Sequence, residues 1–100
     1  MYGLSDIVIQ DICSVLKKHD HIDEAIIFGS RAKGNYHEGS DIDLAIKGHH
    51  ISYEELMDIN IQIDDLGLLY GVDVINYNEK TGTPIGEHID RVGQIFYKKT

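Results

Sequence analysis

Apolar residues recur at two different spacings along the chain, and these spacings predict an alternation of helices and strands. From Ser5 to about His19 the apolar positions follow the helical period. Ser5 is suited to begin this helix, and Lys17 and Lys18 favour its end. The residues on the predicted inner face are Ile9, Ile12, Cys13 and Leu16.

Two further helices are predicted in the second half of the chain. Ser52 with Glu55 three residues later is a capping-box pattern, and a helix follows it until Gly67 or Gly71. Its inner stripe consists of Leu56, Ile59, Ile63 and Leu66. Ile61, Leu68 and Leu69 lie off that stripe, so a neighbour or a partner can cover a second face.

The last predicted helix opens at Thr83–Pro84, since proline suits the first helical position. Its expected inner face consists of Ile85, Ile89, Val92 and Phe96.

Three runs alternate with period two or are short and apolar, and these predict strands: Glu24–Phe28, Asp41–Ile46 and Gly71–Asn76. Helices that alternate with a few strands favour an α/β (α+β) fold, in which helices pack on a small sheet. At this length, residues 1–100 are expected to form a single domain.

Acidic side chains occupy one face of two of these strands. Successive side chains of a strand point to opposite faces, so Asp41 and Asp43 share a face. Asp73 lies between two valines, which is unusual for an acid without water or a partner. On adjacent strands the three carboxylates could converge on divalent cations. The alternative is that each acid only faces solvent.

A glycine-serine turn precedes the first acid pair. Gly29 ends the strand before it, and Ser30 can cap a short helix through Lys33 that Gly34 ends. A helix start offers free N–H groups that bind anions, and Arg31 adds positive charge. Taken alone, this is equally an ordinary strand-to-helix turn.

Together these motifs resemble the signature of the DNA polymerase beta nucleotidyltransferase superfamily. The run Gly29-Ser30-Arg31-Ala32-Lys33-Gly34, then Ser40-Asp41-Ile42-Asp43-Leu44, is similar to that of the minimal nucleotidyltransferases of bacteria and archaea. That group often serves as the antitoxin of a small helical HEPN toxin. The resemblance implies a mixed sheet.

The resemblance also implies roles for individual residues. Asp41, Asp43 and Asp73 would bind two Mg²⁺ ions, and Asp73 would help to deprotonate the attacking hydroxyl. Gly29 and Ser30 would hold the β and γ phosphates of ATP; Arg31 and Ser40 are further candidates for this phosphate site. AMP would pass to a tyrosine of the HEPN toxin and block its RNase site.

Charge and composition limit the kinds of partner that the chain is expected to bind. The net charge of −8 disfavours stable polynucleotide binding by this chain alone, which rests on Lys and Arg. No apolar run reaches membrane-spanning length and no signal-peptide pattern is present, so a membrane association is not expected. A lone Cys13 suits the cytoplasm. His19 and His21 lack companions typical of a zinc site and are expected to be solvated.

Two other functions are open on the sequence. The chain could be a non-catalytic antitoxin that binds nucleotide or neutralises its partner by covering it, with Ile61, Leu68 and Leu69 as the contact surface. It could also transfer a nucleotide to a small molecule, although 100 residues leave little room for a separate acceptor pocket. Changing Asp43 to Asn would separate catalysis from covering.

Overall fold

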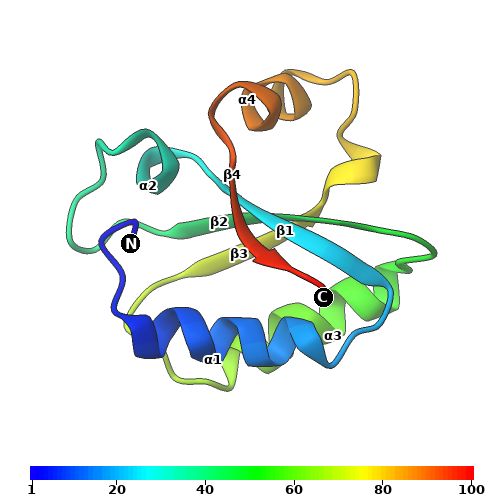
Figure 1. The fold of residues 1–100 in the computed structure, drawn as a ribbon, viewed down its shortest axis with the longest axis horizontal. Helices are drawn as coiled ribbons and strands as arrows, with labels where there is room; N and C mark the ends of the chain where they lie inside the picture. The colour runs from blue at the N-terminus through cyan, green and yellow to red at the C-terminus, as the bar shows by residue number, and fades with distance from the viewer.

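A four-stranded sheet organises the chain in the computed structural model, which describes residues 1–100 (Figure 1). Its strands are β1 (Ile22–Phe28), β2 (Ile42–Gly48), β3 (Val72–Asn76) and β4 (Gln94–Lys98), in the spatial order β3-β2-β1-β4. β1 pairs antiparallel with both β2 and β4, whereas β2 and β3 are parallel. The predicted α/β fold with a mixed sheet is therefore confirmed.

The helices cover the two faces of the sheet unequally. α1 (Asp6–Lys17) and α3 (Tyr53–Asp64) lie side by side on one face, while α2 (Ser30–Lys33) and α4 (Pro84–Val92) lie on the other (Figure 1). A 3₁₀ turn, η1 (Tyr77–Glu79), leads from β3 toward α4. α3 connects the parallel strands β2 and β3, as such a crossover requires.

Local capping sets the helix boundaries close to those predicted. Ser5 Oγ accepts a hydrogen bond from Val8 N, and Ser52 Oγ accepts one from Glu55 N. α3 ends at Asp64, before the predicted stop at Gly67 or Gly71. None of the helices is both long and apolar enough to span a bilayer.

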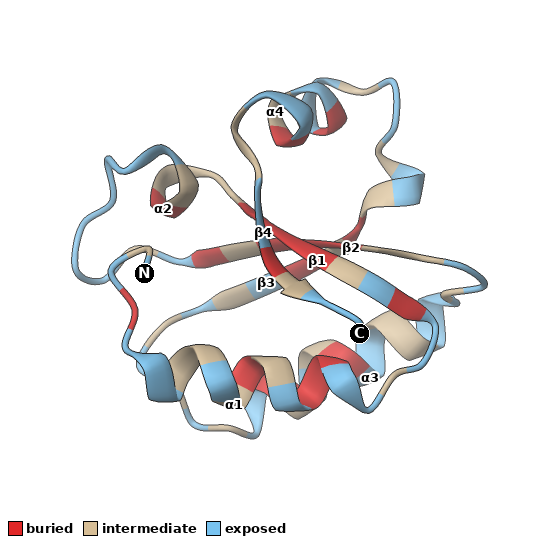
Figure 2. Cartoon of the chain, in the orientation of Figure 1, coloured by how far each residue is buried: buried red, intermediate tan, exposed pale blue.

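The core is concentrated under α1 and α3 (Figure 2). There a cluster of 14 buried residues joins both helices to the sheet, with Leu16, Ile27 and Leu44 fully enclosed. On the opposite face the buried cluster has only three members, Ile26, Ala45 and Ile89. Most of the apolar burial that stabilises the fold is therefore on the α1/α3 face.

The strand β4 was not predicted from the sequence. The apolar spacing places Phe96 on the last helix, but that helix ends at Val92 and Phe96 is buried in the strand that follows. The break falls at Gly93, where a side chain would come within 2.5 Å of Ile26 and 2.4 Å of the carbonyl of Ile89. Glycine thus lets the chain leave the helix close to the sheet and enter β4.

Candidate active site

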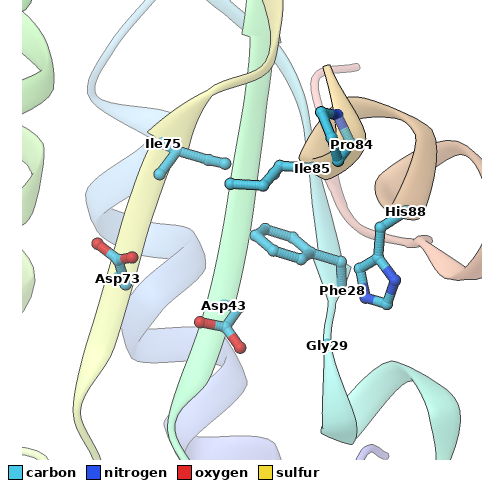
Figure 3. A pocket seen from close by; sticks show the side chains of 8 residues that line it. All are labelled: Phe28, Gly29, Asp43, Asp73, Ile75, Pro84, Ile85 and His88. Atoms are coloured by element: carbon cyan, nitrogen blue, oxygen red, sulfur yellow. The ribbon is translucent and has the colours of Figure 1, made fainter. Parts of the chain in front are cut away.

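Three side chains form a row across the sheet at the edge that faces the loop after β1. Phe28 on β1 pairs with Asp43 on β2, and Asp43 pairs in parallel register with Asp73 on β3. Neighbouring strands lie about 4.8 Å apart, so the two carboxylates start from adjacent backbone positions. Both line one cavity of about 410 Å³ (Figure 3).

Asp41 lies immediately before β2 and is exposed. Its carboxylate lies against Gly71, where a Cβ atom would be 2.7 Å from Asp41 Oδ1. Glycine at position 71 therefore leaves room for this acid beside the start of β3. The structure thus brings all three predicted acids to one edge of the β2–β3 pair.

Gly29 lies directly against the carboxylate of Asp43. Its φ of 75° with ψ of −154° is a backbone conformation that side chains disfavour strongly. A Cβ atom there would be 2.6 Å from Asp43 Oδ2. Both the dihedral angles and the contact require glycine, and the result is a close approach of backbone to a carboxylate.

The carboxylate of Asp43 is held in an unfavourable environment. Partial burial raises the pKa of Asp43, and the nearby charges of Asp73 and Asp41 raise that pKa further. His88 on α4 acts in the opposite direction. The charges of the acids are thus mutually repulsive, and a divalent cation would relieve this repulsion.

The donor set suits a hard cation. Carboxylate oxygens from two strands are ligands that Mg²⁺ prefers, and Mg²⁺ usually keeps several waters beside one or two of them. No three His, Cys, Asp or Glu side chains are close enough to form a ready-made metal cluster. If Asp41, Asp43 and Asp73 bind a cation, waters and substrate phosphates would have to complete its coordination.

The short helix α2 follows Gly29 as predicted and ends at Gly34, which has a φ of 87°. However, the residue that precedes the first turn is Gly29, so Ser30 is the first helical residue and does not cap it. The prediction that Ser30 caps α2 is therefore wrong. Ser30 follows Gly29, which lines the cavity, and a contact between Ser30 and a phosphate stays a prediction.

Arg31 is buried, with 2% of its surface exposed. Its guanidinium lies between two tyrosine rings and donates hydrogen bonds to backbone carbonyls. The stacked rings are those of Tyr36 and Tyr70, and the carbonyls are those of Tyr2, Glu38 and Ser40. In this structure Arg31 thus braces the loop between α2 and β2. A phosphate contact of Arg31 stays a prediction that would require these bonds to break.

Ser40 also has local partners. Its hydroxyl accepts a hydrogen bond from His37 N at 2.7 Å, and its carbonyl receives two from Arg31. These bonds fix the turn that delivers Asp41 to β2. A phosphate contact by Ser40 is a prediction that this geometry leaves open.

Sequence reasoning missed one wall of the cavity. It consists of Pro84, Ile85 and His88 on α4, with Ile75 on β3 opposite (Figure 3). The sequence shows that Ile85 and His88 share a helix face, because they are three residues apart. It does not show over which part of the sheet α4 lies, so this spacing alone could not place the two residues at the cavity.

Residues 10–100 match the family Polymerase beta, Nucleotidyltransferase. The match covers most of the chain, and the chain belongs to this family. No curated protein matches the chain.

Solved structures share the fold at low sequence identity. A toxin–antitoxin complex with AMP-PNP has a TM-score of 0.73 and 18% identity, covering 92% of this chain and 74% of its own. A mutant of the toxin–antitoxin MntA-HpeT gives 0.72 and 15%, with the same coverages of 92% and 74%. A candidate nucleotidyltransferase from Sulfolobus solfataricus gives 0.61 and 22%, covering 93% and 78%.

Proposed function

We propose that this chain is a Mg²⁺-dependent nucleotidyltransferase that moves AMP from ATP to a hydroxyl of a partner protein and acts as an antitoxin. The observation that carries the proposal is the parallel register of Asp43 and Asp73 beside Gly29 in a chain of the polymerase beta family. Acids that repel one another at a glycine turn suit a substrate that arrives with Mg²⁺ and phosphates.

In the proposed reaction, Asp41, Asp43 and Asp73 bind Mg²⁺, with two ions expected. Bound divalent ions supply charge stabilisation for the attacking and leaving oxygens. The backbone at Gly29 and the hydroxyl of Ser30 hold the β and γ phosphates. The acceptor oxygen bonds to the α-phosphorus, Asp73 helps to remove its proton, and pyrophosphate leaves with the electron pair of the broken P–O bond.

Asp73 is suited to the acceptor side of this reaction. It is exposed, whereas Asp43 is half-buried between Gly29 and the cavity. A hydroxyl on another protein can therefore reach Asp73 from solvent without entering the phosphate side. This access supports an acceptor carried on a protein surface.

A toxin is the proposed partner because two of the solved structures with this fold are toxin–antitoxin complexes, one of them with AMP-PNP. By the resemblance of its motif to minimal nucleotidyltransferases, the acceptor is a tyrosine of a HEPN-type toxin in the cytoplasm. The net charge of −8 suits a basic partner, such as an enzyme that binds RNA.

Neutralisation by covering alone is the second candidate. Ile61 and Leu69 are 53% and 96% exposed, so they are available for contact. Leu68, the third residue expected on that surface, packs against the main core instead. The covering surface is therefore smaller than the sequence suggested.

The test uses the chain with ATP, Mg²⁺ and its partner toxin, with the mass of the toxin as the readout. We expect wild type to add AMP, and Asp43→Asn to lower the rate by at least about a hundredfold because charge stabilisation is lost. Asp58→Asn is the matched control, since Asp58 is an exposed acid on α3, on the opposite face of the sheet.

Two results would contradict the proposal. If wild-type chain with ATP and Mg²⁺ adds no AMP to the toxin, the proposed transferase activity is wrong. Full protection of cells from the toxin by Asp43→Asn would show that covering alone suffices.

A further inference from the structure

The cavity extends beyond the carboxylates into an apolar half that the proposed chemistry does not use. Past the row of Phe28, Asp43 and Asp73, its walls are Ile75 on β3 and Ile85 on α4 (Figure 3). These two isoleucine side chains point toward each other across the cavity, with the ring of Phe28 beside them. In the proposed reaction the acids bind the cations, and the cations bind the phosphates. The apolar walls have no role in that chemistry.

Ile85 is exposed although the packing beneath α4 is complete. Ile89, one turn further along the same helix, is 2% exposed and packs on Ile26 and Ala45. Ile85 is 47% exposed and faces the cavity. An apolar side chain left open beside a polar site is typical of a ligand pocket, in which apolar walls adjoin a few polar groups.

The shape of the sheet face explains why a hollow is present. The row behind the acids consists of Ile26, Ala45 and Ile75, in which Ala45 pairs with both neighbours. A small residue stands between two large ones, and α4 crosses above them. Ile75 packs against the buried cluster under α4 on one side and lines the cavity of about 410 Å³ on the other, together with Ile85.

A nucleobase fits this space better than an acceptor side chain, on the assumption that the proposed function holds. The base of ATP is tied through one ribose to the α-phosphate beside Asp43, so it must lie near the acids, and this is the cavity that adjoins them. The remaining cavity of the chain, around Lys17 and Thr100, contains none of the three acids. An acceptor on a partner reaches exposed Asp73 from solvent instead.

We propose that Phe28, Ile75 and Ile85 form a nucleobase subsite, with His88 at its rim. His88 is the only polar side chain of the cavity other than the two acids, and its ring meets that of Phe28 edge-on at 6.3 Å and 79°. Pro84 has no N–H to donate. The subsite therefore holds the base by its faces and reads its edges weakly, so ATP and GTP bind with similar affinity.

The experiment compares binding of Mg²⁺-ATP with Mg²⁺-tripolyphosphate by calorimetry, because tripolyphosphate has the phosphates but no base. For wild type we expect ATP to bind about tenfold tighter or more, from stacking of the base. Ile85→Ser should weaken ATP by about three- to tenfold and leave tripolyphosphate unchanged. Because the side chain of Ile85 is exposed, Ile85→Ser should keep the fold, and its melting temperature checks this.

Ile75→Ser tests the opposite wall with the same two ligands, and the same selective loss is expected. The control is Ile95→Ser, since Ile95 is 54% exposed on β4 and does not line the cavity. His88→Ala is less decisive, because His88 also acts on the charge of Asp43 and would change binding of both ligands.

The outcomes separate the subsite from the function on which it rests. If tripolyphosphate binds as tightly as ATP, or if Ile85→Ser and Ile75→Ser change neither affinity, the base lies elsewhere and the subsite is wrong. If neither ligand binds wild type with Mg²⁺, the nucleotidyltransferase proposal itself fails, and the subsite fails with it. If GTP binds more than about a hundredfold more weakly than ATP, the subsite does distinguish the edges of the bases, and the expected similar affinity of ATP and GTP is wrong.

Discussion

The two faces of the sheet are built on opposite principles. Under α1 and α3, large side chains fill the space and 14 buried residues form one cluster. Under α4, three buried residues hold the helix, and beside them an open cavity reaches the acids. The first face stabilises the chain, and the second leaves apolar surface and charge for a ligand to cover.

The carboxylates of the two faces show the same contrast. Glu55 on α3 lies 3.0 Å from a ring nitrogen of His19 and 3.0 Å from one of His21, and these hydrogen bonds lower its pKa. Asp43 has acids for neighbours and its pKa is raised. A carboxylate with partners contributes to folding, whereas a carboxylate among acids is stabilised only when a cation arrives.

The largest expected effect is the removal of core volume on the filled face. Leu16→Ala should lower the free energy of unfolding by about 3–5 kcal/mol, because Leu16 is fully buried against the sheet. Ile89→Ala should cost about 2 kcal/mol, because α4 rests on a small cluster and can settle. Urea denaturation measures both, and equal costs would remove the contrast between the faces.

Gly29→Ala should cost about 1–3 kcal/mol of folding free energy and abolish binding of Mg²⁺-tripolyphosphate. The new Cβ meets Asp43 at 2.6 Å in a backbone conformation with φ of 75°. Gly34→Ala is the matched control, because it also has a positive φ, of 87°, but a Cβ there meets nothing within 4 Å. Binding that survives Gly29→Ala would separate this turn from the phosphates.

Asp43→Asn should raise the melting temperature without Mg²⁺, although we expect it to remove the proposed transferase activity. The folded-state pKa of Asp43 lies above the ordinary 3.8, so wild type loses stability as the pH rises from 3.8 through that pKa. The variant should lack this loss. Added Mg²⁺ should stabilise wild type and not Asp43→Asn, with Asp58→Asn responding like wild type; an equal response of all three would argue against a cation site.

The smallest effect is expected at Glu55, with the opposite sign. Its folded-state pKa lies below the ordinary 4.5, so its contribution is complete above pH 4.5 and is lost as the pH falls through the folded-state pKa. Glu55→Gln should remove this loss of stability at low pH, and near neutral pH it should lower the free energy of unfolding by less than about 1 kcal/mol. Thermal melts between pH 3 and 7 test it, and an unchanged slope below pH 4.5 would show that the histidine contacts matter little.

The sequence predicted the fold where local signals and tertiary packing agree. Ser5 and Ser52 begin helices as expected, and the period-two run at Asp41–Ile46 is a strand. The prediction that Phe96 lies on the last helix was wrong because its spacing from Ile89 and Val92 continues a helical period across Gly93. The helix ends there because that glycine packs closely on the sheet.

Long-range contacts set the limits of prediction at the site. The pairing of Asp43 with Asp73 could be expected once both runs were strands, because α3 is long enough for a crossover between parallel neighbours. By contrast, the sequence gives no sign that Arg31 turns away to bind backbone carbonyls. Likewise the side chain of His19, which was expected to be solvated, is only 12% exposed, because it contacts Glu55 and Gln62 on α3.

The parallel pairing of β2 with β3 has a consequence for synthesis of the chain. Asp43 and Asp73 meet only after the whole of α3 has been made and has crossed the sheet. A chain still emerging from the ribosome at residue 70 has one half of the pair and no wall from α4. The proposed site is therefore complete only after α4 has been made, and a chain that stops before β3 would lack half of the acid pair.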